Sequence, residues 1–382
     1  MVRSATVIGA GIGGLAAAVG LHRIGWRVAV VEQAAEIDAI GAGITLWPNA
    51  LRALEALGFG ERVRELGKPQ ESAGMRSSDG RWLSRLDGAE IERELGRPML
   101  GVHRAQLHRM LLDELPAVCL HTGVHVTAVG RDGAVPGLDL PPADLVVGAD
   151  GINSQVRARY WPDAPRPRYT GFAAWRAICE RRDLTEIGVS WGRGREFGIV
   201  PLVDGRTYWY VAMPAPEGAR NPDERAYLRE QFASWHSPIP ELIDGTPAEA
   251  VLRNDIRHLG GRLKSYATGN VALLGDAAHA MTPHLGQGGC QALEDAVVLV
   301  AACARFDDVA EALTHYDAER RPRTQQIARA SYWAGRFGPF LANPVAVALR
   351  DTAARLAPSS AAIKTFMRVS GWTPPQIEGL DS

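Results

Sequence analysis

The hydrophobic pattern at the start of the chain alternates between the period of a strand and that of a helix. Residues 4–9 are mostly apolar or β-branched, which predicts a short buried strand. Between Gly13 and Ile24 the apolar residues recur at helical spacing, and Gly25 marks the end of the predicted helix. Residues 27–32 have the composition of a second buried strand. The N-terminus is therefore predicted to fold as a strand–helix–strand unit.

The turn between the first strand and the helix carries glycines at the spacing of a dinucleotide-binding motif. Gly9 permits a tight turn, Gly11 lets the backbone approach a pyrophosphate, and Gly14 allows the helix to pack closely on the strand. Gly13 belongs to the same turn, and the helix that follows offers unpaired N–H groups to phosphates. Glu32, at the end of the second strand, is expected to accept hydrogen bonds from ribose hydroxyls. The complete unit favours a dinucleotide site over an ordinary glycine turn.

Two further apolar strands are predicted far downstream, and each leads into an acidic residue at its end. The strand at 144–148 is followed by Asp150, and the strand at 270–275 by Asp276. The second strand continues through Pro283 to a glycine turn at 286–289, which opens an apolar helix over 290–304. The sequence has no second GxGxxG after a strand, so we expect one dinucleotide with a dedicated site.

With these three motifs in this order, the chain resembles the single-component FAD-dependent aromatic monooxygenases, such as para-hydroxybenzoate hydroxylase. The resemblance extends from about residue 3 to about residue 335. Residues 41–49, GAGITLWPN, resemble the branch that contains the salicylate, 3-hydroxybenzoate, 6-hydroxynicotinate and urate hydroxylases. The resemblance implies FAD as cofactor, NAD(P)H as a transient reductant, O2 as oxidant and a small, aromatic substrate.

The resemblance also implies a set of cofactor-binding residues, carried over by motif. They are Gly9, Gly11, Gly13, Gly14, Glu32, Gly43, Arg104, Val126, Asp150, Asp276, Gly286, Gly288 and Gly289. The family residue that corresponds to Asp276 binds the ribityl chain of FAD, and the family residue that corresponds to Arg104 contacts FAD. The family residue that corresponds to Asp150 interacts with FAD and NAD(P)H. A carboxylate at a strand end can also serve a purely structural role, because it caps the turn that follows. Val126, in a strand predicted over 124–129, is expected to contact adenine through its backbone.

The segment from Asp276 to the glycine turn also carries the residues expected beside the flavin ring. The helix that begins after the turn would favour the negative charge of the reduced flavin by about 0.3–1 kcal/mol. Pro283 matches a family proline whose backbone lies beside the reactive edge of the flavin. His279 and His284 have the chemistry of a catalytic base, but the resemblance favours a structural role for both.

The region from Tyr169 to about Arg257 has the alternating pattern of a sheet. Strands are predicted at 169–178, 196–202 and 207–213, and the last two flank an Asp-Gly turn and predict a hairpin. In the family such a sheet lies over the flavin and forms the substrate pocket. Tyr208 and Tyr210 share one face of their strand, with Trp209 on the other. We expect the tyrosines to face the pocket, although a packed or surface position is an open alternative.

The chain departs from its relatives at positions that bear on the substrate. Urate hydroxylases carry an arginine where this chain has Glu196, and hydroxynicotinate hydroxylases a histidine where it has Thr45. Arg176 and Arg195 stay open as partners for a substrate carboxylate. A larger apolar or phenolic substrate agrees better with three nearby residues, which are Trp47, Phe197 and Ile199.

The predicted fold class is α/β, with a Rossmann-type FAD-binding domain, an inserted antiparallel β-sheet substrate domain and a C-terminal helical extension. The FAD-binding domain is expected to be discontinuous, over residues 1–70, 98–168 and 258–338. The substrate domain takes 71–97 and 169–257, and the extension takes 339–382. No internal repeat is found in the sequence.

Composition and charge restrict the partners. The formal charge of −1 predicts neither nucleic acid nor a membrane as a partner. The 4 cysteines are far apart, which predicts no disulfide framework and no metal site. No targeting segment or membrane-spanning stretch is apparent, so we expect a cytoplasmic protein, monomeric or homodimeric.

The mechanism that the resemblance implies is insertion of one oxygen atom into an electron-rich substrate through a flavin C4a-hydroperoxide. The cofactor carries the difficult chemistry, and the protein positions the substrate and excludes water. Three alternatives stay open: an epoxidase or oxidase of the same fold, a reductase, and a flavin-binding protein without catalysis.

Overall fold

The predicted strand–helix–strand unit forms the centre of the first sheet. The computed structural model describes residues 2–36, 42–130, 132–181 and 183–380. Its N-terminal unit consists of β1 (Ser4–Ile8), α1 (Ile12–Arg23) and β2 (Arg27–Val31). β1 pairs in parallel with β2 on one side and with β9 (Leu145–Gly148) on the other. β1 and β9 are short and fully buried, and β2 is buried apart from Arg27 and Ala29.

Six strands of the described chain make up this first sheet, in the order β15-β16-β9-β1-β2-β8. The remaining members are β8 (Leu120–His121), β15 (Ala267–Thr268) and β16 (Val271–Leu273). All neighbours are parallel except β15 and β16. Asp150 and Asp276 therefore follow parallel strands that end at the same edge, next to the glycine turn after β1.

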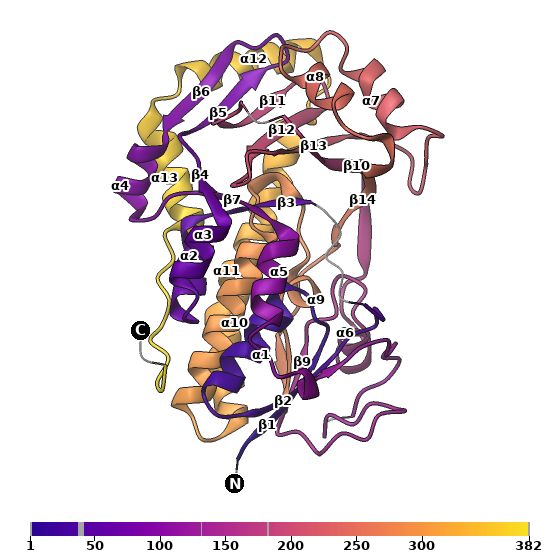
Figure 1. Ribbon diagram of the computed structural model, residues 1–382, viewed down its shortest axis with the longest axis vertical. Coiled ribbons are helices and arrows are strands. Elements are labelled where there is room, and N and C mark those ends of the chain that lie inside the picture. Colours follow the sequence, from indigo (N-terminus) through magenta and orange to yellow (C-terminus); the bar gives the residue numbers. More distant parts are fainter. Residues whose placement is uncertain (1, 37–41, 131, 182, 381–382) are drawn as a thin grey trace.

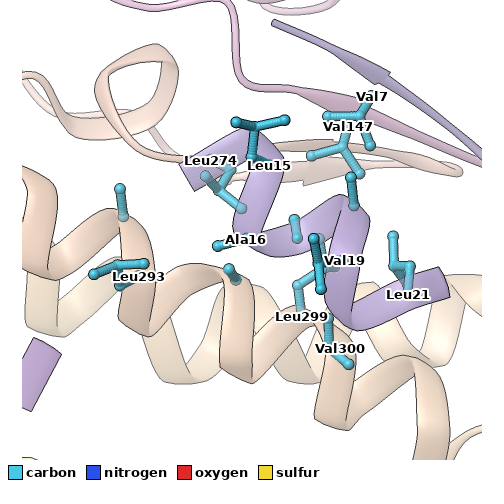
Figure 2. Close-up of a cluster of buried hydrophobic side chains, with 14 of the residues drawn as sticks. Val7, Leu15, Ala16, Val19, Leu21, Val147, Leu274, Leu293, Leu299 and Val300 are labelled. Atoms are coloured by element: carbon cyan, nitrogen blue, oxygen red, sulfur yellow. The ribbon is translucent and has the colours of Figure 1, made fainter. Parts of the chain in front are cut away.

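The main hydrophobic core lies between this sheet, α1 and α10 (Gly288–Arg305). Figure 2 shows Val7 and Val147 of the sheet beside Leu15 and Val19 of α1, with α10 on the other side of the helix. The two helices pack closely at Gly20, where a Cβ would lie 2.5 Å from Val300. Packing of this kind holds α1 firmly against α10.

A second sheet lies at the other end of the molecule (Figure 1), in the order β14-β10-β13-β12-β11-β5-β6. Its strands are β5 (Ser72–Ser77), β6 (Trp82–Asp87), β10 (Pro167–Cys179), β11 (Ile187–Trp191), β12 (Glu196–Pro201), β13 (Thr207–Pro214) and β14 (Leu252–Leu259). Neighbours are antiparallel except β5 and β11, so the sheet is mixed and the predicted antiparallel pattern is incomplete. The exception arises because β5 comes from an earlier segment and is not joined to β11 by a hairpin.

The two faces of the second sheet have different surroundings. Trp209 and Phe197 are buried on one face, under α7 (Glu224–Gln231) and α8 (Ile239–Asp244). Ile199 lies on this same face, so it and Phe197, named with Trp47 as favouring a larger apolar substrate, face away from Tyr208 and Tyr210. The reason is the strand period of two, which turns both residues away from Glu196.

The other elements connect and cover the two sheets. A small sheet, β3-β7-β4, consists of β3 (Gly43–Leu46), β7 (Leu100–His103) and β4 (Gly67–Pro69). The helices not yet given are α2 (Pro48–Ala56), α3 (Gly60–Leu66), α4 (Gly88–Leu95), α5 (Arg104–Leu112), α6 (Gln155–Tyr160), α9 (Asp276–His279), α11 (Val309–Phe337), α12 (Pro344–Leu356) and α13 (Ser359–Ser370). Short 3₁₀ turns are η1 (Ala117–Cys119), η2 (Ala248–Ala250) and η3 (Pro283–Leu285). Within the described residues, no helix combines the length and apolarity needed to cross a bilayer.

The strand predicted over 124–129 does not form. These residues have no regular secondary structure, although Val126 itself is buried. Val124 makes one backbone hydrogen bond, to the carbonyl of Glu32, and the segment does not continue as a ladder. A short alternating pattern was therefore insufficient to predict a strand.

A buried ion cluster joins α10 to α11. The guanidinium of Arg320 donates to Asp295 Oδ1 at 2.7 Å and to Glu294 Oε2 at 2.6 Å, and all three side chains are 0% exposed. Burial alone would raise the pKa of Asp295, but His279 and Arg320 overcome it and lower that pKa to about 2. The cluster therefore holds two helices together through charges that have no access to water.

We expect Arg320→Met to destabilise the protein by about 3–5 kcal/mol, because it removes the fully buried cation that Glu294 and Asp295 share, although Arg323 and His279 still contact them. The free energy of unfolding in urea measures this, with the exposed Arg93 as the matched control position for the same change. A loss no larger than that of Arg93→Met would contradict the importance of the cluster.

The lowered pKa of Asp295 predicts a pH dependence. A carboxylate whose pKa is lower in the folded state stabilises the protein above its unfolded pKa of about 3.9, and this contribution is lost as the pH falls toward 2. The difference in unfolding free energy between wild type and Asp295→Asn should stay constant from neutral pH to about pH 5 and shrink below about pH 4. A difference that changes between pH 7 and 5 would point to another group.

Candidate active site

The glycine turn after β1 has a geometry that only glycine fits at two positions. Gly9 has a φ of 106°, and a Cβ there would lie 2.4 Å from the carbonyl oxygen of Ala149. A Cβ at Gly14 would lie 2.1 Å from the carbonyl oxygen of Gly9. These contacts bring the turn, α1 and the strand end before Asp150 into one tight unit.

The outer side of the same turn is open. Among the residues described, no atom lies within 4 Å of the position that a Cβ would take at Gly11. Glu32 closes the turn from the side, because its carboxylate accepts from Ala10 N at 2.8 Å and from Ala34 N at 2.9 Å. Gly13 instead packs against Leu274 and Ala292, where a Cβ would lie 2.6 and 2.9 Å from their side chains. The open backbone at Gly11 is where a pyrophosphate could approach, and Gly13 serves helix packing.

Asp150 caps the next helix. Its Oδ2 accepts from the backbone N–H of Gln155 at 2.7 Å and of Val156 at 3.2 Å, at the N-terminus of α6. Its Oδ1 is buried and has no hydrogen-bond partner in the part of the chain that the structure describes. A buried carboxylate oxygen normally accepts a hydrogen bond, so this atom is available to a donor from a bound group.

Asp276 and Arg104 have many protein atoms around them, but neither side chain is fully enclosed. Both side chains are exposed to solvent. Desolvation nevertheless raises the pKa of the Asp276 carboxyl, against the influence of His279 and Arg104. Desolvation and the nearby Arg176 lower the pKa of Arg104, with Asp276 and Tyr208 acting in the opposite direction. Arg104 and Asp276 are thus close enough to influence each other's pKa, and both remain accessible to solvent.

The turn before α10 places glycine backbone beside the aromatic ring of Trp47. Gly286 has a φ of 61°, and a Cβ there would lie 2.9 Å from Trp47 Nε1. At Gly288, nothing described lies within 4 Å of a Cβ position, so the first turn of α10 is open on that side. Pro283 begins η3 and is exposed. The N–H groups at this helix start are available to an acceptor.

One face of the second sheet, here called the tyrosine face, carries Tyr208 and Tyr210, which pack on glycines. The ring of Tyr208 lies on Gly43 of β3, where a Cβ would be 2.4 Å from Tyr208 Cγ. Tyr210 covers Gly198 of β12 in the same way, at 2.0 Å from its Cζ. Burial raises the pKa of Tyr208 to about 12, and burial together with Glu196 raises that of Tyr210 well above its usual value. Both phenols therefore keep their O–H at neutral pH.

Glu196 and His284 form a buried pair that sequence reasoning did not bring together. Glu196 Oε1 and His284 Nδ1 are 3.3 Å apart, and the side chains are 5% and 3% exposed. His284 follows Pro283, and its ring meets Phe340 edge-on at 4.6 Å. The only sequence signal was a glutamate on the tyrosine face of an otherwise apolar strand.

The remaining predicted positions have different surroundings. Val126 is buried in a loop, and His279 is buried with its Nε2 2.6 Å from Asp295 Oδ2, which is a structural contact. Gly41 of the GAGITLWPN segment lies outside the described residues. Gly289 approaches Ile44, with a Cβ position 2.9 Å from Ile44 Cδ1.

Taken together, the open backbone and the charged groups fit an extended dinucleotide. The glycine turn and Glu32 suit a pyrophosphate and a ribose, Asp276 suits a hydroxyl-rich chain, and the start of α10 suits an electron-rich ring. The tyrosine face of the second sheet meets this region through Tyr208 on Gly43 and through Glu196 beside His284. A small molecule held there would lie between the sheet and the ring.

Comparison with known proteins agrees with this arrangement. Residues 3–331 match the family described as FAD binding domain. The chain is 37% identical over 381 residues to an aurachin C monooxygenase/isomerase of Stigmatella aurantiaca, which covers 96% of this chain and 98% of that protein. It is 34% identical over 384 residues to a 2-heptyl-3-hydroxy-4(1H)-quinolone synthase of Pseudomonas aeruginosa, with 94% and 96% covered.

A solved structure shares the whole architecture. The crystal structure of Klebsiella pneumoniae HpxO complexed with FAD and uric acid superposes with a TM-score of 0.88 at 29% identity, covering 98% of this chain and 97% of that one. The predicted fold class, cofactor and enzyme class are therefore confirmed. The chain belongs to the FAD binding domain family, and within it to the FAD-dependent monooxygenases that act on aromatic substrates.

Proposed function

We propose that this monooxygenase hydroxylates a neutral aromatic or heteroaromatic compound that carries an N–H or O–H donor and no carboxylate. The observation that carries the proposal is Glu196, a buried acid on the tyrosine face of the second sheet. Urate hydroxylases, which this chain resembles, carry an arginine at this position. The side chain in this protein therefore has the opposite charge. An acid at this place accepts a hydrogen bond from a donor group and repels a substrate carboxylate.

The protein residues divide the work between holding the cofactor and orienting the substrate. Bound FAD supplies the electron transfer and the oxygen activation, with O2 as oxygen source and NAD(P)H as the reductant typical of the family. Asp276 and Arg104 would hold FAD together with Glu32 and the glycine turns. The role of Asp150, with its free Oδ1, is also in cofactor binding. Val126 and Gly43 stay predicted cofactor contacts.

The proposed substrate side includes two tyrosines whose hydroxyl groups stay protonated. Tyr208 and Tyr210 are 6.1 Å apart between ring centroids and present O–H donors on apolar walls. Pro283 and His284 lie across from them on the segment before α10, and His284 fixes one oxygen of Glu196. We infer that the substrate ring lies between Pro283 and the tyrosines, with its donor group directed to Glu196.

Two relatives are consistent with such a substrate. The 2-heptyl-3-hydroxy-4(1H)-quinolone synthase is named for an alkylated quinolone. HpxO was crystallised with uric acid, a different heteroaromatic. Because Glu196 differs in charge from the arginine of the urate hydroxylases, the alkylated quinolone is a better analogue of this chain's substrate than uric acid.

We expect Asp276→Ala to weaken FAD binding by about tenfold or more, because it removes a carboxylate acceptor from the candidate site. The ratio of flavin absorbance to protein after purification and reconstitution measures this. Asp307→Ala, at an exposed position, is the matched control. Full flavin occupancy in Asp276→Ala would contradict the assigned role.

We expect Glu196→Gln to lower kcat/KM for a neutral N–H substrate such as a 2-alkyl-4(1H)-quinolone by about 10- to 100-fold, since a charge-assisted hydrogen bond is lost. Glu196→Arg should reverse the preference between that compound and its 3-carboxylate. Both rates are followed by substrate-stimulated NAD(P)H oxidation and by the mass of the oxygenated product.

The exposed Glu61 provides the control variant Glu61→Gln, which should keep wild-type rates. A wild-type enzyme that prefers the carboxylated compound would overturn the substrate class. Oxidation of NAD(P)H that proceeds with substrate but without O2 would instead identify a reductase.

A further inference from the structure

Helix α12 presents apolar side chains to solvent on one face. Val345, Leu349 and Leu356 are 66%, 67% and 79% exposed. At about 100° per residue, these positions lie within about 40° of each other around the helix. A helix on the surface of a globular protein normally directs its polar residues outward. The outward face of α12 therefore has the character of a contact surface.

The inner side of α12 is anchored, so this face has a fixed direction. Arg350 donates to the carbonyl oxygen of Gly338 at 2.8 Å, pairs with Asp351 at 2.7 Å and lies 5.3 Å from the ring centroid of Trp191. Asn343 caps the start of the helix by accepting from the N–H groups of Val345 and Ala346. Figure 1 shows α12 at the end of the molecule opposite the N-terminus, on the outside of β5 and β6.

The segment around α12 is strongly positive. Residues 329–370 contain six basic residues, which are Arg329, Arg336, Arg350, Arg355, Lys364 and Arg368, and one acid, Asp351. The segment has a net charge of +5. Because the whole chain has a net charge of −1, the residues outside the segment have a net charge of −6. Arg355, Lys364 and Arg368 are exposed, whereas Asp351 is paired with Arg350. The expectation of no membrane partner rested on the total charge, which conceals this asymmetry.

An apolar helix face within a positive segment suits an anionic lipid surface. Apolar side chains enter the boundary between headgroups and acyl chains, and basic residues nearby are attracted to acidic headgroups. A symmetric contact between two copies through α12 would bring two positive segments together, which is unfavourable. We propose that α12 docks this protein on the surface of an anionic bilayer without crossing it.

The docking helix is directly connected to the candidate active site. α13 follows α12 after a short link, and its Phe366 stacks on Trp47 with ring centroids 4.8 Å apart. Trp47 in turn lies beside Gly286, at the turn before α10. A protein held by α12 would thus have this wall of its site close to the lipid. An alkylated substrate that partitions into the bilayer would be concentrated there.

Cosedimentation of the FAD-loaded, full-length protein with lipid vesicles tests the proposal. We expect binding to vesicles of phosphatidylcholine with phosphatidylglycerol, weaker binding to phosphatidylcholine alone, and weaker binding at high salt. Val345→Glu should reduce binding about tenfold, because it places a charge in the apolar contact. Val118→Glu is the matched control, since Val118 on η1 is 83% exposed and distant in sequence.

Flavin content and activity toward a water-soluble substrate should be unchanged in both variants, which separates docking from the proposed catalytic function. Absence of binding to either vesicle, or equal loss in both variants, would overturn the proposal. A change from dimer to monomer in Val345→Glu by analytical ultracentrifugation, with vesicle binding unchanged, would show that a second copy covers this face.

Discussion

The buried ion cluster around Arg320 is the interaction on which the geometry of the active site depends. Glu294 and Asp295 are adjacent in α10, and Arg320 of α11 binds both without access to water. Ionised groups removed from water are stable only while their partners stay in place. Any rotation of α10 against α11 would separate them, so the cluster fixes the orientation of the helix that begins at the open glycine turn of the candidate site.

Hydrogen bonds connect this cluster to two turns of the candidate FAD site. Asp295 accepts from Gly275 N at 3.0 Å, which fixes the turn that presents Asp276. Glu294 accepts from Asn49 Nδ2 at 2.6 Å, and that amide also donates to Gln287 in the turn before α10. Fully buried groups thus hold the backbone of the first turn and the Gln287 side chain of the second. A cofactor then meets a preorganised site and spends little binding energy on ordering it.

Sequence reasoning succeeded where the information is local. The glycine turn after β1 depends on residues within one strand–helix unit, so its spacing was enough to predict Gly9 and Gly14 at tight positions. It failed where contacts join distant segments: Glu196 and His284 are 88 residues apart, and no pattern relates them. The orientation of Phe197 depended on which face of β12 meets α8, which alternation alone does not decide. Two adjacent acids within the apolar run of α10 were the one available signal for the ion cluster.

The second sheet explains how one fold accommodates different substrates. Alternate residues of β12 and β13 belong either to the core under α7 and α8 or to the face that carries Tyr208, Tyr210 and Glu196. A substitution at Glu196 therefore changes the charge of the pocket without disturbing Phe197 or Trp209, which stabilise the sheet from the other side. Stability and specificity are assigned to opposite faces of the same strands. This separation lets a residue on the tyrosine face change its charge while the core that supports the sheet is kept.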